Sequence, residues 1–79
     1  MTTQKAVGLR LSSLMVSKNL TPYALAKKSA LTDSTLRSIL AEEYKTVKLD
    51  TLVLLCDGLD ITLTEFFNDS IFDRVNLEV

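Results

Sequence analysis

The residue types in this chain favour hydrogen-bonded recognition over catalysis. The 79 residues contain no histidine and a single cysteine, Cys56. Nucleophilic and acid–base enzymes need a base beside the reacting group, and no pattern in the sequence arranges one near Cys56 or pairs two carboxylates. The Cys and His spacings of zinc sites are absent, and one cysteine cannot form an internal disulfide. We therefore predict that the chain is not an enzyme and holds no metal or cofactor.

The polar groups best suited to recognition lie in residues 29–40 (SALTDSTLRSIL). Thr32 is a good N-cap for a helix on which Leu36 and Ile39 share the apolar face. The opposite face holds Asp33, Ser34, Arg37 and Ser38, with Thr35 near the boundary. Arg37 offers a planar fork of donors that can bond one partner at two points. The outward face of this short helix is therefore the candidate site.

Length and composition indicate one small globular domain. Hydrophobic residues make up 47% of the chain and charged residues 24%, a balance typical of globular proteins. The longest apolar stretch, residues 52–56, is far shorter than the roughly 20 residues of a membrane span, and the N-terminus has no signal-peptide core. We expect a cytoplasmic protein without a membrane segment.

The net charge of −1 hides an uneven distribution along the chain. Residues 1–32 carry five basic groups and no acid, whereas residues 49–79 carry seven acids and one arginine. A polyanion could bind only the basic part. From charge alone, both parts could equally be ordinary solvated surface.

Hydrophobic periodicity predicts an all-α fold. Five short helices are expected at about 4–17, 22–29, 33–42, 49–57 and 63–69. Asn19 suits a left-handed residue after the first helix, Thr21 and Pro22 suit the start of the second, and Gly58 suits the end of the fourth. Cys56 falls on the apolar stripe of the fourth helix and is expected in the core. The tail, residues 70–79, has mixed helix and strand patterns and stays unassigned.

The second and third helices, joined by a three-residue turn with small Ala26 where they must pack closely, form a helix-turn-helix. The segments LTPYALAKKSALTDSTLRSIL and LDTLVLLCDGLDITLTEFF resemble the phage-repressor-like family (lambda repressor and Cro, or Xre type) over roughly residues 8–68. The matching elements are Thr21 with Leu25 and Ala26, Thr32 with Ser34 and Thr35, Leu49 to Leu52, and Thr62 to Phe67. The resemblance implies a five-helix repressor-like bundle over residues 1–69 that binds double-stranded DNA.

In that family the helix at 33–42 would enter the major groove. Arg37 is then the candidate for direct readout of guanine, and Ser34 and Ser38 are adaptable partners. Asp33 would either accept from a base amine or serve only as a favourable acid at the helix start. Thr32 would both cap the helix and lie next to a phosphate, with Thr35 beside it.

Phosphate contacts are expected from the groups that flank this helix. The candidates are Lys27 and Lys28 before it, and Tyr44, Lys45 and Lys48 after it. Each lysine alone could equally be an ordinary solvated residue, and Tyr44 could instead cover the loop. Ala30 stands at a turn position that the family usually gives to glycine, so a positive φ there would be strained.

The resemblance implies a small transcriptional regulator, a repressor, that binds as a homodimer. The fifth helix and the tail, with Phe72, Val75, Leu77 and Val79, are the candidate dimer surface, or they pack on their own core. The alternative function is a protein-interaction module of the same fold, an antitoxin or a repressor antagonist. Because we see no effector domain, we expect control by abundance or by a protein antagonist.

Overall fold

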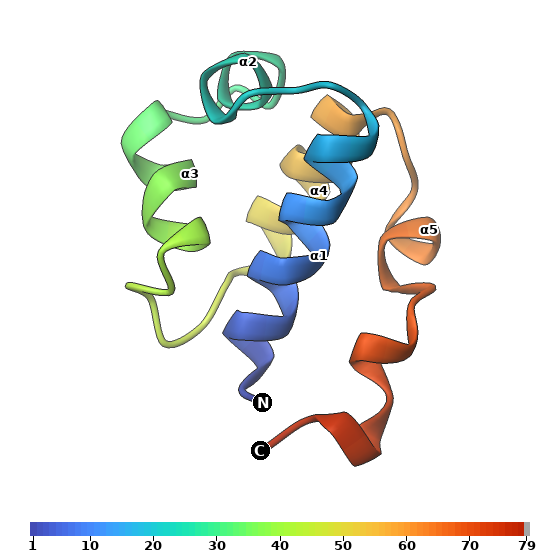
Figure 1. The fold of residues 1–79 in the computed structure, drawn as a ribbon. Coiled ribbons are helices and arrows are strands. Elements are labelled where there is room, and N and C mark those ends of the chain that lie inside the picture. The colour runs from blue at the N-terminus through green and yellow to red at the C-terminus, as the bar shows by residue number, and fades with distance from the viewer. Residues whose placement is uncertain (79) are drawn as a thin grey trace.

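Five α-helices build the chain in the computed structural model, which describes residues 1–78. They are α1 (Thr3–Ser17), α2 (Pro22–Lys28), α3 (Asp33–Leu40), α4 (Leu49–Leu59) and α5 (Leu63–Phe67). In Figure 1, α2 lies across one end of the molecule, and α3 and α5 lie on opposite sides of α1. The all-α prediction is confirmed, with each predicted helix found. No helix in the described part of the chain is long and apolar enough to cross a membrane.

A single core joins the five helices. It contains one fully buried residue or more from each of them, including Leu11, Leu25, Leu36, Leu55 and Phe66. Burying each such side chain contributes roughly 1.5 to 3 kcal/mol before the loss of chain entropy is counted. Cys56 belongs to this core, as predicted, and burial raises the pKa of its thiol.

Threonine starts four of the five helices. The hydroxyls of Thr2, Thr21, Thr32 and Thr62 each accept a hydrogen bond from a backbone N–H in the first turn. Such caps satisfy donors that have no partner inside the helix. The exception is α4, which begins after Lys48 without any side-chain cap.

The same backbone motif ends the first four helices, and none of them uses glycine. Asn19, Ala30, Glu42 and Asp60 all have positive φ, between 56° and 60°. In each case the next N–H bonds back to a carbonyl five residues earlier, as in a Schellman motif. The prediction for Asn19 is confirmed. The expectation that Gly58 ends α4 is wrong, because that helix continues to Leu59 and ends at Asp60. Likewise α3 stops at Leu40 because Glu42 turns left-handed.

Ala30→Gly should stabilise the protein. Ala30 has φ 56°, a conformation in which a Cβ costs about 1 kcal/mol relative to glycine. Thermal unfolding followed by circular dichroism should show a higher Tm, by roughly 4 to 8 °C for a domain of this size. The matched control is Ala41→Gly, because Ala41 is also exposed after a helix but has φ −85°. An unchanged or lower Tm for Ala30→Gly would contradict the strain argument.

The tail packs on its own chain. Two 3₁₀ turns, Ser70–Phe72 and Arg74–Asn76, bring Phe72 against Phe66 and Phe67, with ring centroids 5.8 and 4.9 Å away. Glu78 then pairs with Thr2 in a parallel bridge, so the two ends of the chain meet, as Figure 1 shows. Of the tail residues predicted for a dimer surface, Phe72 and Leu77 are partly buried in this way, Val75 is exposed, and Val79 lies outside the described residues.

Candidate nucleic-acid interface

The helix-turn-helix presents one face of α3 to solvent. Leu36 and Ile39 are buried and fix the helix against α1 and α2, while the Arg37 side chain is 62% exposed on the other side. Asp33, Thr35 and Ser38 are half-buried, and Thr32 and Ser34 are exposed. The residues predicted to face outward therefore lie on the accessible side of the helix or at its edge.

An ion pair links two of these candidates. The Nε of Arg37 donates to Oδ2 of Asp33 at 2.7 Å, one helical turn away. The other carboxylate oxygen of Asp33, Oδ1, is buried and has no hydrogen-bond partner within residues 1–78. Oδ1 is thus closed to a base amine and Oδ2 already accepts from Arg37, which weighs against direct base contact by Asp33.

Three hydroxyls cluster at the start of α3. The Thr32 oxygen accepts from the backbone N–H of Thr35 at 3.1 Å and donates to the Thr35 hydroxyl at 2.7 Å. The Ser34 hydroxyl lies 3.3 Å from that of Thr32. The cap predicted at Thr32 is confirmed, and it gathers Thr32, Ser34 and Thr35 at one end of the helix.

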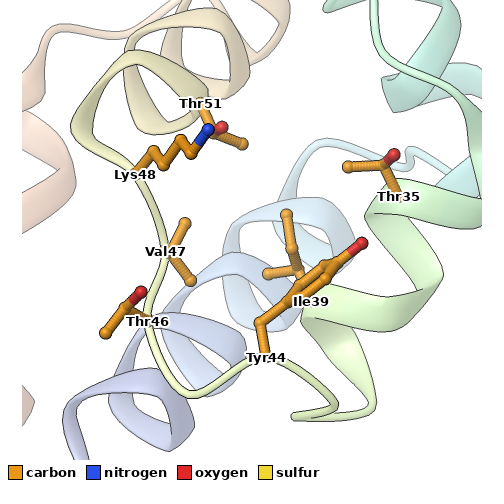
Figure 2. Close-up of a pocket in the computed structure, with 7 residues that line it drawn as sticks. All are labelled: Thr35, Ile39, Tyr44, Thr46, Val47, Lys48 and Thr51. Atoms are coloured by element: carbon orange, nitrogen blue, oxygen red, sulfur yellow. The ribbon is translucent and has the colours of Figure 1, made fainter.

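A pocket of about 370 Å³ lies between α3 and the start of α4. Figure 2 shows Thr35, Ile39 and Tyr44 on one side of it and the segment that leads into α4 on the other. That segment lines the pocket with Thr46, Val47, Lys48 and Thr51. The fold thereby brings together Thr35, Tyr44 and Lys48, three candidates that are separated in the sequence. Lys45 is exposed but does not line the pocket.

The uncapped start of α4 adds donors to this pocket. Lys48 is the N-cap residue, and within residues 1–78 no side-chain cap bonds the first backbone N–H groups of α4. A helix start of this kind carries partial positive charge and suits an anion. Thr46 and Thr51 were not predicted as site residues. Their only sequence signal is that they flank Lys48, and the pocket became visible only in the folded chain.

The basic groups before α3 lie at the end of α2. Lys27 and Lys28 are both exposed there. The ammonium of Lys27 lies 5.9 Å from the ring centroid of Tyr23, close enough for a cation–π interaction. Sequence reasoning did not single out Tyr23, although its spacing of four residues from Lys27 predicts this contact on a helix.

Arg10 does not belong to this basic surface. Its Nε donates to the carbonyl of Phe66 and its Nη2 to that of Glu65, both at 2.8 Å. Its Nη1 lies 3.4 Å from Oδ2 of Asp69. One of the five basic groups in residues 1–32 is therefore turned toward α5 instead of toward solvent.

The chain is an all-α domain of five helices, with a helix-turn-helix at α2 and α3 and an exposed polar face on α3. This architecture is typical of a class of DNA-binding domains. Residues 10–70 match the family model of the Cro/C1-type HTH DNA-binding domain, and the chain belongs to this family. The resemblance stated from the sequence is thereby confirmed, and the family is one of DNA-binding regulators, not a typical enzyme family. The comparisons with curated proteins and with solved structures give no match.

Proposed function

We propose that the chain binds specific sites in double-stranded DNA as a small transcriptional regulator, a repressor, with α3 in the major groove. The observation that carries this proposal is the exposed guanidinium of Arg37, which lies opposite the buried Leu36 and Ile39. An arginine fork can bond the O6 and N7 of a guanine together. Ser34 and Ser38 would supply adaptable hydrogen bonds beside it.

Phosphate contacts would come from both sides of α3. The pocket at the start of α4 combines the hydroxyls of Thr35, Tyr44 and Thr51 with the ammonium of Lys48, a set that suits a phosphate of the DNA backbone. We assign Thr32 to a phosphate near the start of α3, and the remaining lysines to phosphates farther along the duplex. These are Lys27, Lys28 and Lys45.

Arg37→Ala should relax recognition at one base pair. Duplexes are selected from a random pool at physiological salt, and the enriched site is titrated by fluorescence anisotropy over a series of salt concentrations. We expect an enriched site whose affinity falls steeply with salt. At the base pair that Arg37 reads, Arg37→Ala should lose roughly tenfold discrimination, within the 1 to 3 kcal/mol of a bidentate contact.

The matched control is Arg74→Ala, which removes an exposed arginine of the tail, away from α3. It should leave the base preference unchanged. If wild type enriches no site, and wild type and Arg37→Ala bind alike at nonspecific affinity, the proposal is wrong.

We further propose a homodimer on a two-fold-symmetric site, because one recognition helix buries only a modest interface. Phe67 on α5 is 40% exposed and borders an open hollow with Leu63, Thr64 and Asn68. The outer side of α5, continued by the exposed Val75 of the tail, is the proposed dimer surface. Sedimentation velocity with and without the selected duplex tests this, and a one-to-one complex throughout would refute it.

One feature favours the alternative function, a protein-interaction module such as an antitoxin or repressor antagonist. Toward its end, the outer face of α4 exposes Val53 beside two acids, Asp57 and Asp60. Such a face repels DNA but can accept a basic protein segment. A failed DNA selection would therefore turn the search to a protein partner. The cytoplasmic location and control by abundance or by a protein antagonist stay predictions.

A further inference from the structure

The three arginines of the chain are held in different ways. Arg10 uses two of its guanidinium nitrogens on carbonyls of α5 and the third on Asp69, and Arg74 donates from Nη1 to the carbonyl of Leu77. Arg37 alone has its Nε bound by a carboxylate, that of Asp33, while neither terminal nitrogen has a partner within residues 1–78. The Nε side of its guanidinium is thus held by Asp33, and the side formed by Nη1 and Nη2 faces outward, open to a partner.

We propose that Asp33 is a positioning residue that holds Arg37 for end-on recognition of a base, and this inference rests on the proposed function. A charge-assisted bond of 2.7 Å restricts the side-chain torsions of Arg37. With Nε occupied, only Nη1 and Nη2 remain to donate. These two nitrogens form the edge that matches the paired acceptors of guanine. An unrestrained arginine could bond a base through Nε and one terminal nitrogen or through both terminal nitrogens. Asp33 therefore leaves Arg37 only the second of these two geometries.

The geometry favours positioning over direct contact for Asp33. Its Oδ1 is buried and its Oδ2 already accepts from Arg37, so a base amine would have to share Oδ2 with the guanidinium. The carboxylate also offsets the positive charge of Arg37. The pair is therefore attracted less to phosphates than a lone arginine would be, which trades nonspecific affinity for base discrimination.

Asp33→Asn tests this through two measurements that should move in opposite directions. The variant keeps the size of the side chain but removes its charge and weakens the bond to Nε. We expect three- to tenfold less discrimination at the base pair that Arg37 reads. Binding to a random duplex should become tighter, by up to a few fold, because a negative charge near the phosphates is gone. In an Arg37→Ala background, Asp33→Asn should change discrimination no further.

The matched control is Asp50→Asn. Asp50 is also an exposed acid in the first turn of a helix, α4. Removing its charge should raise nonspecific affinity slightly and leave every base preference intact. A role of Asp33 limited to helix stability would instead lower Tm and reduce affinity uniformly across duplexes.

A second readout needs no DNA. In the ¹⁵N NMR spectrum of the free protein, the Nε proton of Arg37 should exchange slowly with water in wild type and rapidly in Asp33→Asn. If wild type prefers a site but Asp33→Asn keeps full discrimination, the positioning role is wrong and the proposed function stands. If the Nε proton is unprotected in wild type, the positioning role is also wrong. If wild type shows no preferred duplex, both proposals fail.

Discussion

Gly58→Ala should lower the free energy of unfolding by about 2 to 3 kcal/mol, although alanine is the better helix former. Gly58 lies inside α4 with negative φ, so its backbone does not require glycine. A Cβ there would overlap the Oγ of Ser29 and come within 3.1 Å of Ser29 N and of a methyl carbon of Leu25. The residue lets the end of α2 approach α4. Overpacking therefore outweighs the roughly 1 kcal/mol of helix propensity that alanine gains.

The other glycine of the chain is the matched control. A Cβ at Gly8, in α1, would meet only the carbonyl oxygens of Ile39 and Leu40, at 3.6 and 3.9 Å, which is ordinary contact. Gly8→Ala should therefore stabilise the fold by up to about 1 kcal/mol. Urea unfolding at 25 °C should show opposite signs for the two variants. Equal signs would mean that close approach is not what keeps Gly58.

A double-mutant cycle identifies the obstacle. Ser29 is buried, and its Oγ has no hydrogen-bond partner among the described residues, so Ser29→Ala alone should be neutral or slightly stabilising. Combined with Gly58→Ala, it removes the closest of the overlapping atoms and should recover part of the lost stability. Additive effects would point away from the contact between Ser29 and Gly58.

The helices could be predicted from the sequence because their signals are local. Apolar spacing placed all five, and threonine caps marked the starts of α2 and α3 correctly. Helix ends were harder, because Ala30 and Glu42 adopt a left-handed conformation that their residue types do not favour. The interpretation of Gly58 as a helix end failed because Asp60, a residue type that tolerates the left-handed conformation, ends α4 instead. Gly58 is needed because α4 packs closely against Ser29, which is distant in sequence.

In the candidate site, too, the features set by local sequence could be predicted, and those set by contacts between distant residues could not. The exposed face of α3 followed from Leu36 and Ile39, and the spacing of Asp33 and Arg37 allows an ion pair on any helix. The side-chain torsions of Arg37 and Asp33 determine that the pair forms through Nε. These torsions cannot be predicted from residue spacing. The pocket at the start of α4 depends on how the loop after α3 returns, so Thr46 and Thr51 carried no usable signal.

Arg10→Met should cost about 3 kcal/mol, since a hydrogen bond from a charged donor contributes about 1.5 to 3 kcal/mol and Arg10 makes two to backbone carbonyls. These carbonyls, of Glu65 and Phe66, belong to α5, and α5 has only five residues to hold it in place. Methionine keeps an apolar stem of similar length, so the variant removes mainly the donors. Urea unfolding measures the loss.

Two controls separate the carbonyl bonds from charge. Lys5→Met removes an exposed cation from the same helix and should change stability by less than about 0.5 kcal/mol. Asp69→Asn removes the partly exposed ion pair, which contributes little in water, and its amide oxygen can still accept from the backbone N–H of Ile71. The loss in Arg10→Met should therefore persist at high salt.

At temperatures where this variant is folded, its DNA affinity and salt dependence should equal those of wild type, because Arg10 is engaged by α5 and does not face the duplex. If the DNA affinity of Arg10→Met depended less on salt than that of wild type, Arg10 would belong to the DNA-binding surface. That result would contradict its role in holding α5.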